Sequence, residues 1–177
     1  MTLKGLSSQI GGIIIIMNKK KDYGMKKIYL AGSFAYASKK ITRQRQEKIN
    51  EVAKYLRSNN YEVYVPHELK IPNAWDYSNE DWSTMVFSND VVALKECDFI
   101  VLLSYGKHKN NAGVAWECGF AFGLGKRVIM VCMDLKETES LMMVNGSYVR
   151  LNGTEGLKKY DLEIQPLQEN PKQLKQS

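Results

Sequence analysis

The sequence has few of the residues that usually bind metals or form disulfides. It contains three cysteines and two histidines in 177 residues. Cys97, Cys118 and Cys132 are an odd number without metal-ligand spacing, and each lies in an apolar stretch. We therefore expect no metal site, and we interpret the cysteines as small buried side chains of a protein in a reducing cytoplasm.

The sequence also lacks an apolar run long enough to cross a bilayer. The apolar stretch 10–17 is far shorter than the ~20 residues that a spanning helix needs. No small-residue cleavage site precedes the lysines at 19–21, so a secretory signal is not indicated. We expect no membrane association.

The net charge of +6 does not belong to the body of the chain. Residues 1–27 sum to +5 and residues 165–177 to +1, so residues 28–164 are neutral in total. A protein that binds a nucleic-acid polymer needs a basic face on its folded body to displace counterions. We therefore expect no nucleic-acid partner.

The length suits one compact domain with a substantial core. Met17 and Met25 are both possible start residues. We expect residues 1–24 to form a disordered extension, residues 25–167 to form the domain, and residues 168–177 to form a frayed polar tail.

Strands alternate with helices from residue 27 onward. The expected strands are 27–31, 62–65, 99–103, 127–133 and 147–151, and the expected helices are 41–58, 83–97 and 113–123. This alternation predicts an α/β fold with a doubly wound, flavodoxin-like parallel sheet of five strands in the order 2-1-3-4-5, covered by helices on both faces. In such sheets ligands bind at the carboxyl ends of the strands.

Glu117 is the one formal charge in the segment 112–125, AGVAWECGFAFGLG. Its helical neighbours three and four residues away are small or apolar. An ionised carboxylate in such a place must be paired, line a cavity or be neutralised. We interpret Glu117 as a nucleophile that acts on a sugar. The alternative is a glutamate that reaches solvent or caps a backbone group.

Asp90 is a second carboxylate in an apolar setting. Its expected helix places the apolar residues Val86, Phe87, Val91 and Leu94 on one face, and Asp90 lies within that stripe. Two carboxylates facing one crevice are the minimum set for cleaving a glycosidic bond. The alternative is that Asp90 accepts hydrogen bonds from a loop or a helix N-terminus.

The glycine-rich segments do not match known phosphate-binding loops. The segment 119–126 departs from the P-loop pattern, and the residues after the first strand, 31–34, lack the G-x-G-x-x-G fingerprint of dinucleotide-binding folds. We therefore expect no bound cofactor.

Four segments resemble the nucleoside 2-deoxyribosyltransferase family. They are KKIYLAGSF at 26–34, WSTMVFSNDVVALKECDFIVLL at 82–103, GVAWECGFAFGLGKRVIMV at 113–131 and LMM at 141–143. They occur in the order that the family has, and the resemblance covers residues 26 to 166. The N-D…D pair followed by G-x-A-x-E-x-G-x-A is its most specific part.

The resemblance implies an enzyme that exchanges the base of 2′-deoxynucleosides through a deoxyribosyl-enzyme ester. By position, Glu117 would be the nucleophile, Tyr29 would orient it, and Asp90 would contact the base and move its proton. The residues implied to bind substrate are Gly32, Ser33, Phe34, Asn111, Gly113 and Met143, and Phe34, Trp82 and Phe87 would line the base pocket.

The resemblance also implies its partners: a nucleoside or nucleotide, a free base, and further copies of the chain in a homo-oligomer with shared active sites. Two positions depart from the family pattern. Asn111 replaces an aspartate that binds sugar hydroxyls, and Leu141 replaces an asparagine that a neighbouring subunit supplies. Losing an acidic group removes repulsion against a phosphate, and Lys107 and Lys109 precede this position. A nucleoside 5′-monophosphate N-glycosidase is therefore the alternative function, and a non-catalytic nucleotide-binding module is the third.

Overall fold

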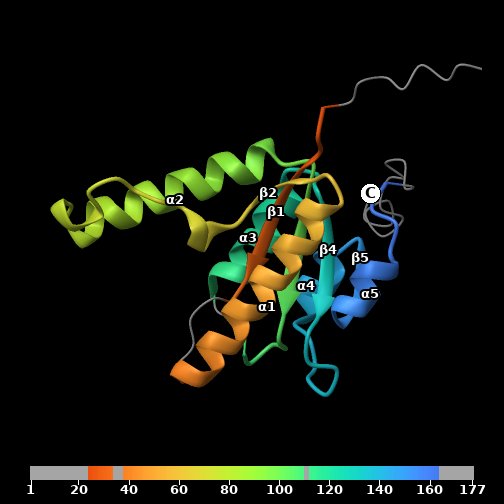
Figure 1. Ribbon diagram of the computed structural model, residues 1–177. Coiled ribbons are helices and arrows are strands. Elements are labelled where there is room, and N and C mark those ends of the chain that lie inside the picture. The colour runs from red at the N-terminus through yellow and green to blue at the C-terminus, as the bar shows by residue number, and fades with distance from the viewer. Residues whose placement is uncertain (1–23, 34–37, 110–111, 164–177) are drawn as a thin grey trace, which may run out of the picture.

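The computed structural model describes residues 24–33, 38–109 and 112–163. One sheet of five parallel strands has the order β2-β1-β3-β4-β5 (Figure 1). The strands are β1 (Lys27–Gly32), β2 (Glu62–Tyr64), β3 (Phe99–Ser104), β4 (Arg127–Cys132) and β5 (Val149–Asn152). The predicted fold class and strand order are confirmed. The expected disorder at the termini falls almost entirely outside the described residues and stays a prediction.

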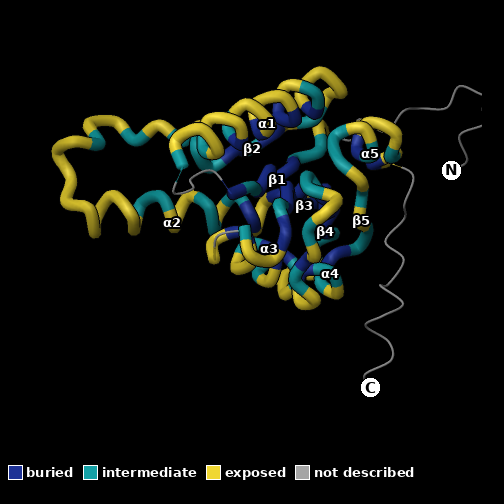
Figure 2. The backbone as a smooth tube through the Cα atoms, turned by 90° about the horizontal axis from the view of Figure 1, so that it is seen from below, coloured by how far each residue is buried: buried dark blue, intermediate teal, exposed yellow. Residues whose placement is uncertain are grey.

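Helices cover both faces of the sheet. They are α1 (Lys39–Ser58), α2 (Asn79–Glu96), α3 (Ala112–Gly123), α4 (Leu141–Gly146) and α5 (Gly153–Lys159), with short 3-10 helices at Pro66–Glu68 and Ala74–Asp76. Figure 2 shows α1 and α5 on one side of the strands and α3 and α4 on the other. None of the helices in the described ranges is long and apolar enough to cross a membrane.

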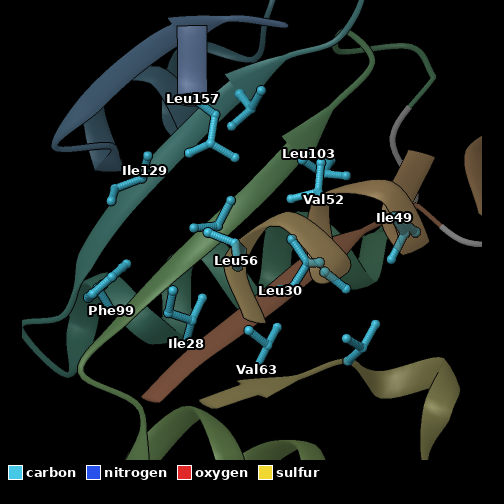
Figure 3. Packing of buried hydrophobic residues seen from close by; sticks show 14 of the residues in the cluster. Ile28, Leu30, Ile49, Val52, Leu56, Val63, Phe99, Leu103, Ile129 and Leu157 are labelled. Atoms are coloured by element: carbon cyan, nitrogen blue, oxygen red, sulfur yellow. The ribbon is translucent and has the colours of Figure 1, made fainter. Parts of the chain in front are cut away.

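Alternate residues of the strands supply two separate cores. Ile28 and Leu30 of β1 pack with α1 and α5 residues such as Leu56 and Leu157 (Figure 3). Tyr29 and Ala31, which alternate with them along β1, belong to the second core, which contains residues of α2, α3 and α4. Because side chains alternate along a strand, the sequence of β1 places Tyr29 on the face that α3 covers, which we call the α3 face; the opposite side is the α1 face.

Helix α2 begins four residues earlier than the sequence predicted. The hydroxyl of Ser78 accepts a hydrogen bond from the backbone N–H of Asp81 at 3.1 Å, and the Ser78 hydroxyl also lies 2.7 Å from the Asp81 carboxylate. Such a cap satisfies an N–H that has no partner within the helix. The expected start at residue 83 was wrong because the polar first turn has no apolar periodicity.

The predicted apolar face of α2 is mostly uncovered. Leu94 is its only fully buried residue, whereas Phe87 is 54% exposed. The tube in Figure 2 shows the helix extending away from the sheet, with exposed residues over much of its length. The expectation that Asp90 lies on a buried helix face is thus corrected for the single chain: Asp90 is half-buried, at the level where α2 meets the sheet.

Candidate active site

Tyr29 and Glu117 are brought together by β1 and α3. The Tyr29 hydroxyl donates a hydrogen bond of 2.7 Å to Oε1 of Glu117. Tyr29 is completely buried, with 0% of its surface exposed. Because a strand residue fixes the position of the hydroxyl, the tyrosine holds the carboxylate in one orientation.

The surroundings of Glu117 disfavour its ionised form. The pKa of this carboxyl is raised from 4.5 to about 7, mainly by burial and in smaller part by the nearby charge of Asp90. The hydrogen bond from Tyr29 acts in the opposite direction, because it stabilises the carboxylate. Glu117 therefore changes charge near neutral pH.

Asp90 is held by a tyrosine that the sequence did not single out. The hydroxyl of Tyr64 donates to Oδ1 of Asp90 at 2.8 Å. Burial raises the pKa of Asp90, and the Tyr64 bond lowers it. Burial also raises the pKa of both tyrosine hydroxyls, so each stays a donor.

The two pairs touch through their rings. Tyr29 and Tyr64 are in register across β1 and β2, and their rings stack with 5.4 Å between centroids. Tyr64 was detectable in principle: it is the third residue of a short strand predicted beside β1, on the same face as Tyr29. The structure thus assembles a row of carboxylate, tyrosine, tyrosine and carboxylate from α3, β1, β2 and α2.

Two of the residues expected to bind substrate lie at the carboxyl end of β1. Ser33 is fully buried, and its hydroxyl accepts a hydrogen bond of 2.5 Å from Nη1 of Arg45. At Gly32 a Cβ would approach Cδ1 of Ile49 to 3.1 Å, so α1 packs closely against this strand end. Arg45 was missed from the sequence, although it lies four residues before Ile49 in the apolar stripe of α1.

The other expected binding residues are not gathered into one pocket in the described chain. Gly113 is exposed in the first turn of α3, and Met143 is buried in the core of the α3 face, to which Tyr29 also belongs. Phe34 and Asn111 lie outside the described residues.

Aromatic residues expected to line the base pocket lie on the surface of the single chain. In α2, Trp82 is 46% exposed and Phe87 is 54% exposed. The Phe87 ring lies 5.2 Å from the Trp116 ring, which in turn stacks on Phe120 at 4.9 Å. Phe87 of α2 and the rings of Trp116 and Phe120 on α3 thus form a row across two helices, which we call the exposed aromatic row.

The loop before α3 is tied to the loop after β4. Nζ of Lys109 lies 3.1 Å from Asp134 and 3.0 Å from Glu137. Gly106 has φ of +94°, and a Cβ there would lie 2.5 Å from Cβ of Glu137. Lys109 therefore pairs with two carboxylates, which weakens its predicted use for a phosphate, whereas Lys107 is exposed.

The three cysteines are free and buried, as the sequence predicted. Burial raises the pKa of the Cys118 thiol to about 11. A thiol with so high a pKa is a poor nucleophile at neutral pH, so the residue beside Glu117 contributes packing.

Comparisons with known proteins identify the family of the chain. Residues 28–166 match the family model described as nucleoside 2-deoxyribosyltransferase. A structure of a 2-deoxyribosyltransferase from Bacillus psychrosaccharolyticus is 26% identical, with a TM-score of 0.66 over 77% of this chain and 93% of that chain. A CMP N-glycosidase from Clostridium botulinum is 18% identical, with a TM-score of 0.49 over 75% of this chain and 94% of that one. No curated protein sequence matches. By the family match, this chain belongs to the nucleoside 2-deoxyribosyltransferase family.

Proposed function

We propose that the protein is a nucleoside 2-deoxyribosyltransferase that exchanges the base of 2′-deoxynucleosides through a covalent deoxyribosyl-glutamate. The observation that carries this proposal is the buried Tyr29 hydroxyl bonded to Glu117 at 2.7 Å. An oriented carboxylate in a largely desolvated place is suited to attack a carbon that develops positive charge. The family match and the 26% identical 2-deoxyribosyltransferase support the same reaction class.

In the first half of the reaction, a carboxylate oxygen of Glu117 forms a bond to C1′ of the deoxyribose. The bond from C1′ to the base nitrogen breaks, and its electron pair leaves with the base. Asp90 supplies the proton that the departing base needs, which is why the raised pKa of Asp90 is useful. The products of this half are a neutral base and a sugar ester on Glu117.

In the second half, a nitrogen of the acceptor base attacks C1′ and the ester bond breaks. The electron pair of that bond returns to the Glu117 carboxylate, and the acceptor base gives its proton to Asp90. Two inversions at C1′ give overall retention. Tyr29 stays a hydrogen-bond donor throughout, because its own pKa is raised by burial and by the neighbouring carboxylates.

The second candidate is hydrolysis of nucleoside 5′-monophosphates, in which water takes the place of the acceptor base. The observation that favours it is Asn111, a neutral residue where the family pattern has an acidic one. The pairing of Lys109 with Asp134 and Glu137 argues against it, because that ammonium is already neutralised by two carboxylates.

We also propose that the protein works in the cytoplasm as a homo-oligomer with shared active sites. The exposed aromatic row supports association, because large exposed apolar patches mark interaction surfaces. Leu141 and Met142 of α4 add to this support, since they are 77% and 83% exposed. The free cysteines fit a reducing compartment.

One assay separates the candidate functions. The protein is incubated with deoxyinosine plus adenine, and separately with deoxynucleoside 5′-monophosphates, and the products are resolved by chromatography. Deoxyadenosine in the first mixture supports the transferase, whereas free base from the monophosphates without exchange supports the hydrolase. Glu117→Gln should abolish either reaction, and Glu155→Gln, at an exposed position of α5, is the matched control. Turnover by Glu117→Gln at the wild-type rate, or no turnover by the wild type, would refute a catalytic role for Glu117.

A further inference from the structure

A buried guanidinium occupies a place where α1 should present an apolar side chain. The buried residues of α1 are Arg45, Ile49, Val52, Ala53 and Leu56, at the spacing of one helix face. Arg45 exposes only 2% of its surface. Since removing a charge from water is costly unless other groups compensate it, its contacts indicate what the charge is for.

Arg45 contacts the residues that follow two neighbouring strands. Its Nη1 donates to the hydroxyl of Ser33, directly after β1, at 2.5 Å. Its guanidinium carbon lies 4.3 Å from the ring centroid of Tyr105, directly after β3. Cation–π and charge-assisted contacts of this kind are strong where water is excluded. One side chain thus joins the carboxyl ends of β1 and β3.

These two strands are the place where the order of the sheet reverses. β2 lies on one side of β1, and β3, β4 and β5 follow on the other side. Ligands of doubly wound sheets bind in the crevice outside this switch point. The segments that leave β1 and β3 there are the ones expected to touch substrate, with Gly32 and Ser33 on the first.

A cavity of about 630 Å³ lies beside the guanidinium on the α1 face, lined among others by Ile41, Gln44, Lys48 and Met133. Arg45 and Tyr105 both line this cavity, and the hydrogen bond to Ser33 holds the guanidinium at its wall. The Tyr29–Glu117 pair belongs to the opposite face. Helix α1, which carries Arg45, therefore lies on the opposite side of the sheet from the helix that carries Glu117.

We infer that Arg45 is a positioning residue that fixes the β1 and β3 strand ends against each other and thereby sets substrate affinity. The inference rests on the proposed function for its kinetic part. Because Arg45 acts through Ser33 and Tyr105, its loss should weaken substrate binding and leave the ionisation of Glu117 unchanged.

The kinetic test uses Arg45→Met, Arg45→Lys and Ser33→Ala in the full chain, with deoxyinosine as donor and adenine as acceptor. Arg45→Met should raise KM for deoxyinosine about tenfold, as expected for one lost charge-assisted hydrogen bond, with kcat changed less than about twofold. Arg45→Lys keeps the charge and a donor, so it should recover part of the affinity. Arg43→Met is the control, because Arg43 lies on the same helix with 81% of its side chain exposed.

Two further kinetic results test the mechanism of the effect. Adding Ser33→Ala to Arg45→Met should have little further effect, since residues that act through one contact are not additive. The midpoint of the acid limb of the pH profile should be the same in the wild type and in Arg45→Met. An unchanged KM in folded Arg45→Met, or a loss confined to kcat, would overturn the inference.

Backbone hydrogen exchange provides a test that does not need activity. Arg45→Met should accelerate exchange of the amides at residues 32–33 and 105–106 relative to Arg43→Met, with little change in α3. If the wild type turns over no nucleoside or nucleotide but this local acceleration is seen, the proposed function fails and the structural role of Arg45 stands. Unchanged exchange at both strand ends would rule that role out, and Ser33→Ala provides the same comparison if Arg45→Met does not fold.

Discussion

The rings of Tyr29 and Tyr64 stack at an interplanar angle of 29°, while their hydroxyls donate to two different carboxylates, Glu117 and Asp90. The register of two parallel strands places both rings side by side. A change in one pair is therefore transmitted to the other through packing as well as through charge.

Activity should depend on pH through Glu117. Its pKa of about 7 means that the carboxylate form of Glu117, which the proposed function requires, becomes the major form near neutral pH. We expect kcat/KM for base exchange to rise with pH on an acid limb as Glu117 loses its proton, and to fall at higher pH as Asp90 loses the proton that the departing base needs. A rate that stays constant from weakly acidic to weakly alkaline pH would contradict a nucleophile with this pKa.

Tyr29→Phe should shift the acid limb of the pH profile to higher pH. The phenylalanine keeps the ring but removes the donor that stabilises the Glu117 carboxylate, so the pKa of Glu117 should rise above 7. We expect kcat/KM below neutral pH to fall by roughly tenfold, the size of one lost hydrogen bond to a charged group. Tyr61→Phe, which removes a hydroxyl bonded to exposed Glu163, is the control and should leave the profile in place.

Glu117 should also weaken the fold as pH rises. Because its pKa is about 7 when folded and 4.5 ordinarily, the folded chain holds more protons than the unfolded chain between these values. The free energy of unfolding attributable to this group therefore falls as pH rises through that window. The comparison is the free energy of unfolding of Glu117→Gln minus that of the wild type, measured by urea denaturation at each pH. This difference should be larger above pH 7 than near pH 4 by on the order of 2 kcal/mol. An equal difference at the two pH values would disagree with the raised pKa.

Tyr64→Phe should affect the proton step. It removes the hydrogen bond that lowers the pKa of Asp90 while leaving the ring to stack on Tyr29, so the pKa of Asp90 should rise. Burial helps to keep a proton on Asp90, and the Tyr64 hydrogen bond limits the rise in its pKa. Without that bond Asp90 becomes a weaker acid toward the departing base, so kcat should fall several-fold. Comparison of donors whose bases differ in basicity checks this, because the loss should be greatest for the most basic leaving group, which depends most on receiving the proton.

Phe87→Asp should disrupt association. Phe87 is 54% exposed and contacts Trp116, so a charge there would enter the exposed aromatic row at its α2 end. If copies of the chain meet at this row, light scattering should show a smaller species and base exchange should be lost. Lys95→Asp is the control at an exposed site on the same helix, and an unchanged mass for Phe87→Asp would exclude this surface as the contact.

The sequence was sufficient for the sheet because its central strands are continuous apolar runs, such as Phe99–Ser104, which is buried throughout. It was less informative about α2, whose start depends on the Ser78 cap rather than on periodicity. Among the residues to which we give a role, Glu117 was visible as an isolated charge. Tyr64 was detectable only from its place on the same strand face as Tyr29. Arg45 was not visible, because an arginine in a helix is ordinary until its partner Ser33 is located in space.

Gly106 limits how the sequence of this protein can vary. With φ of +94° and Glu137 so close, any side chain at position 106 would separate the two loops that Lys109 joins. Gly119 on α3 has no atom within 4 Å of a Cβ placed there, and alanine is a better helix former than glycine. In a saturation library selected for activity, we expect glycine alone to survive at position 106, whereas position 119 should accept alanine.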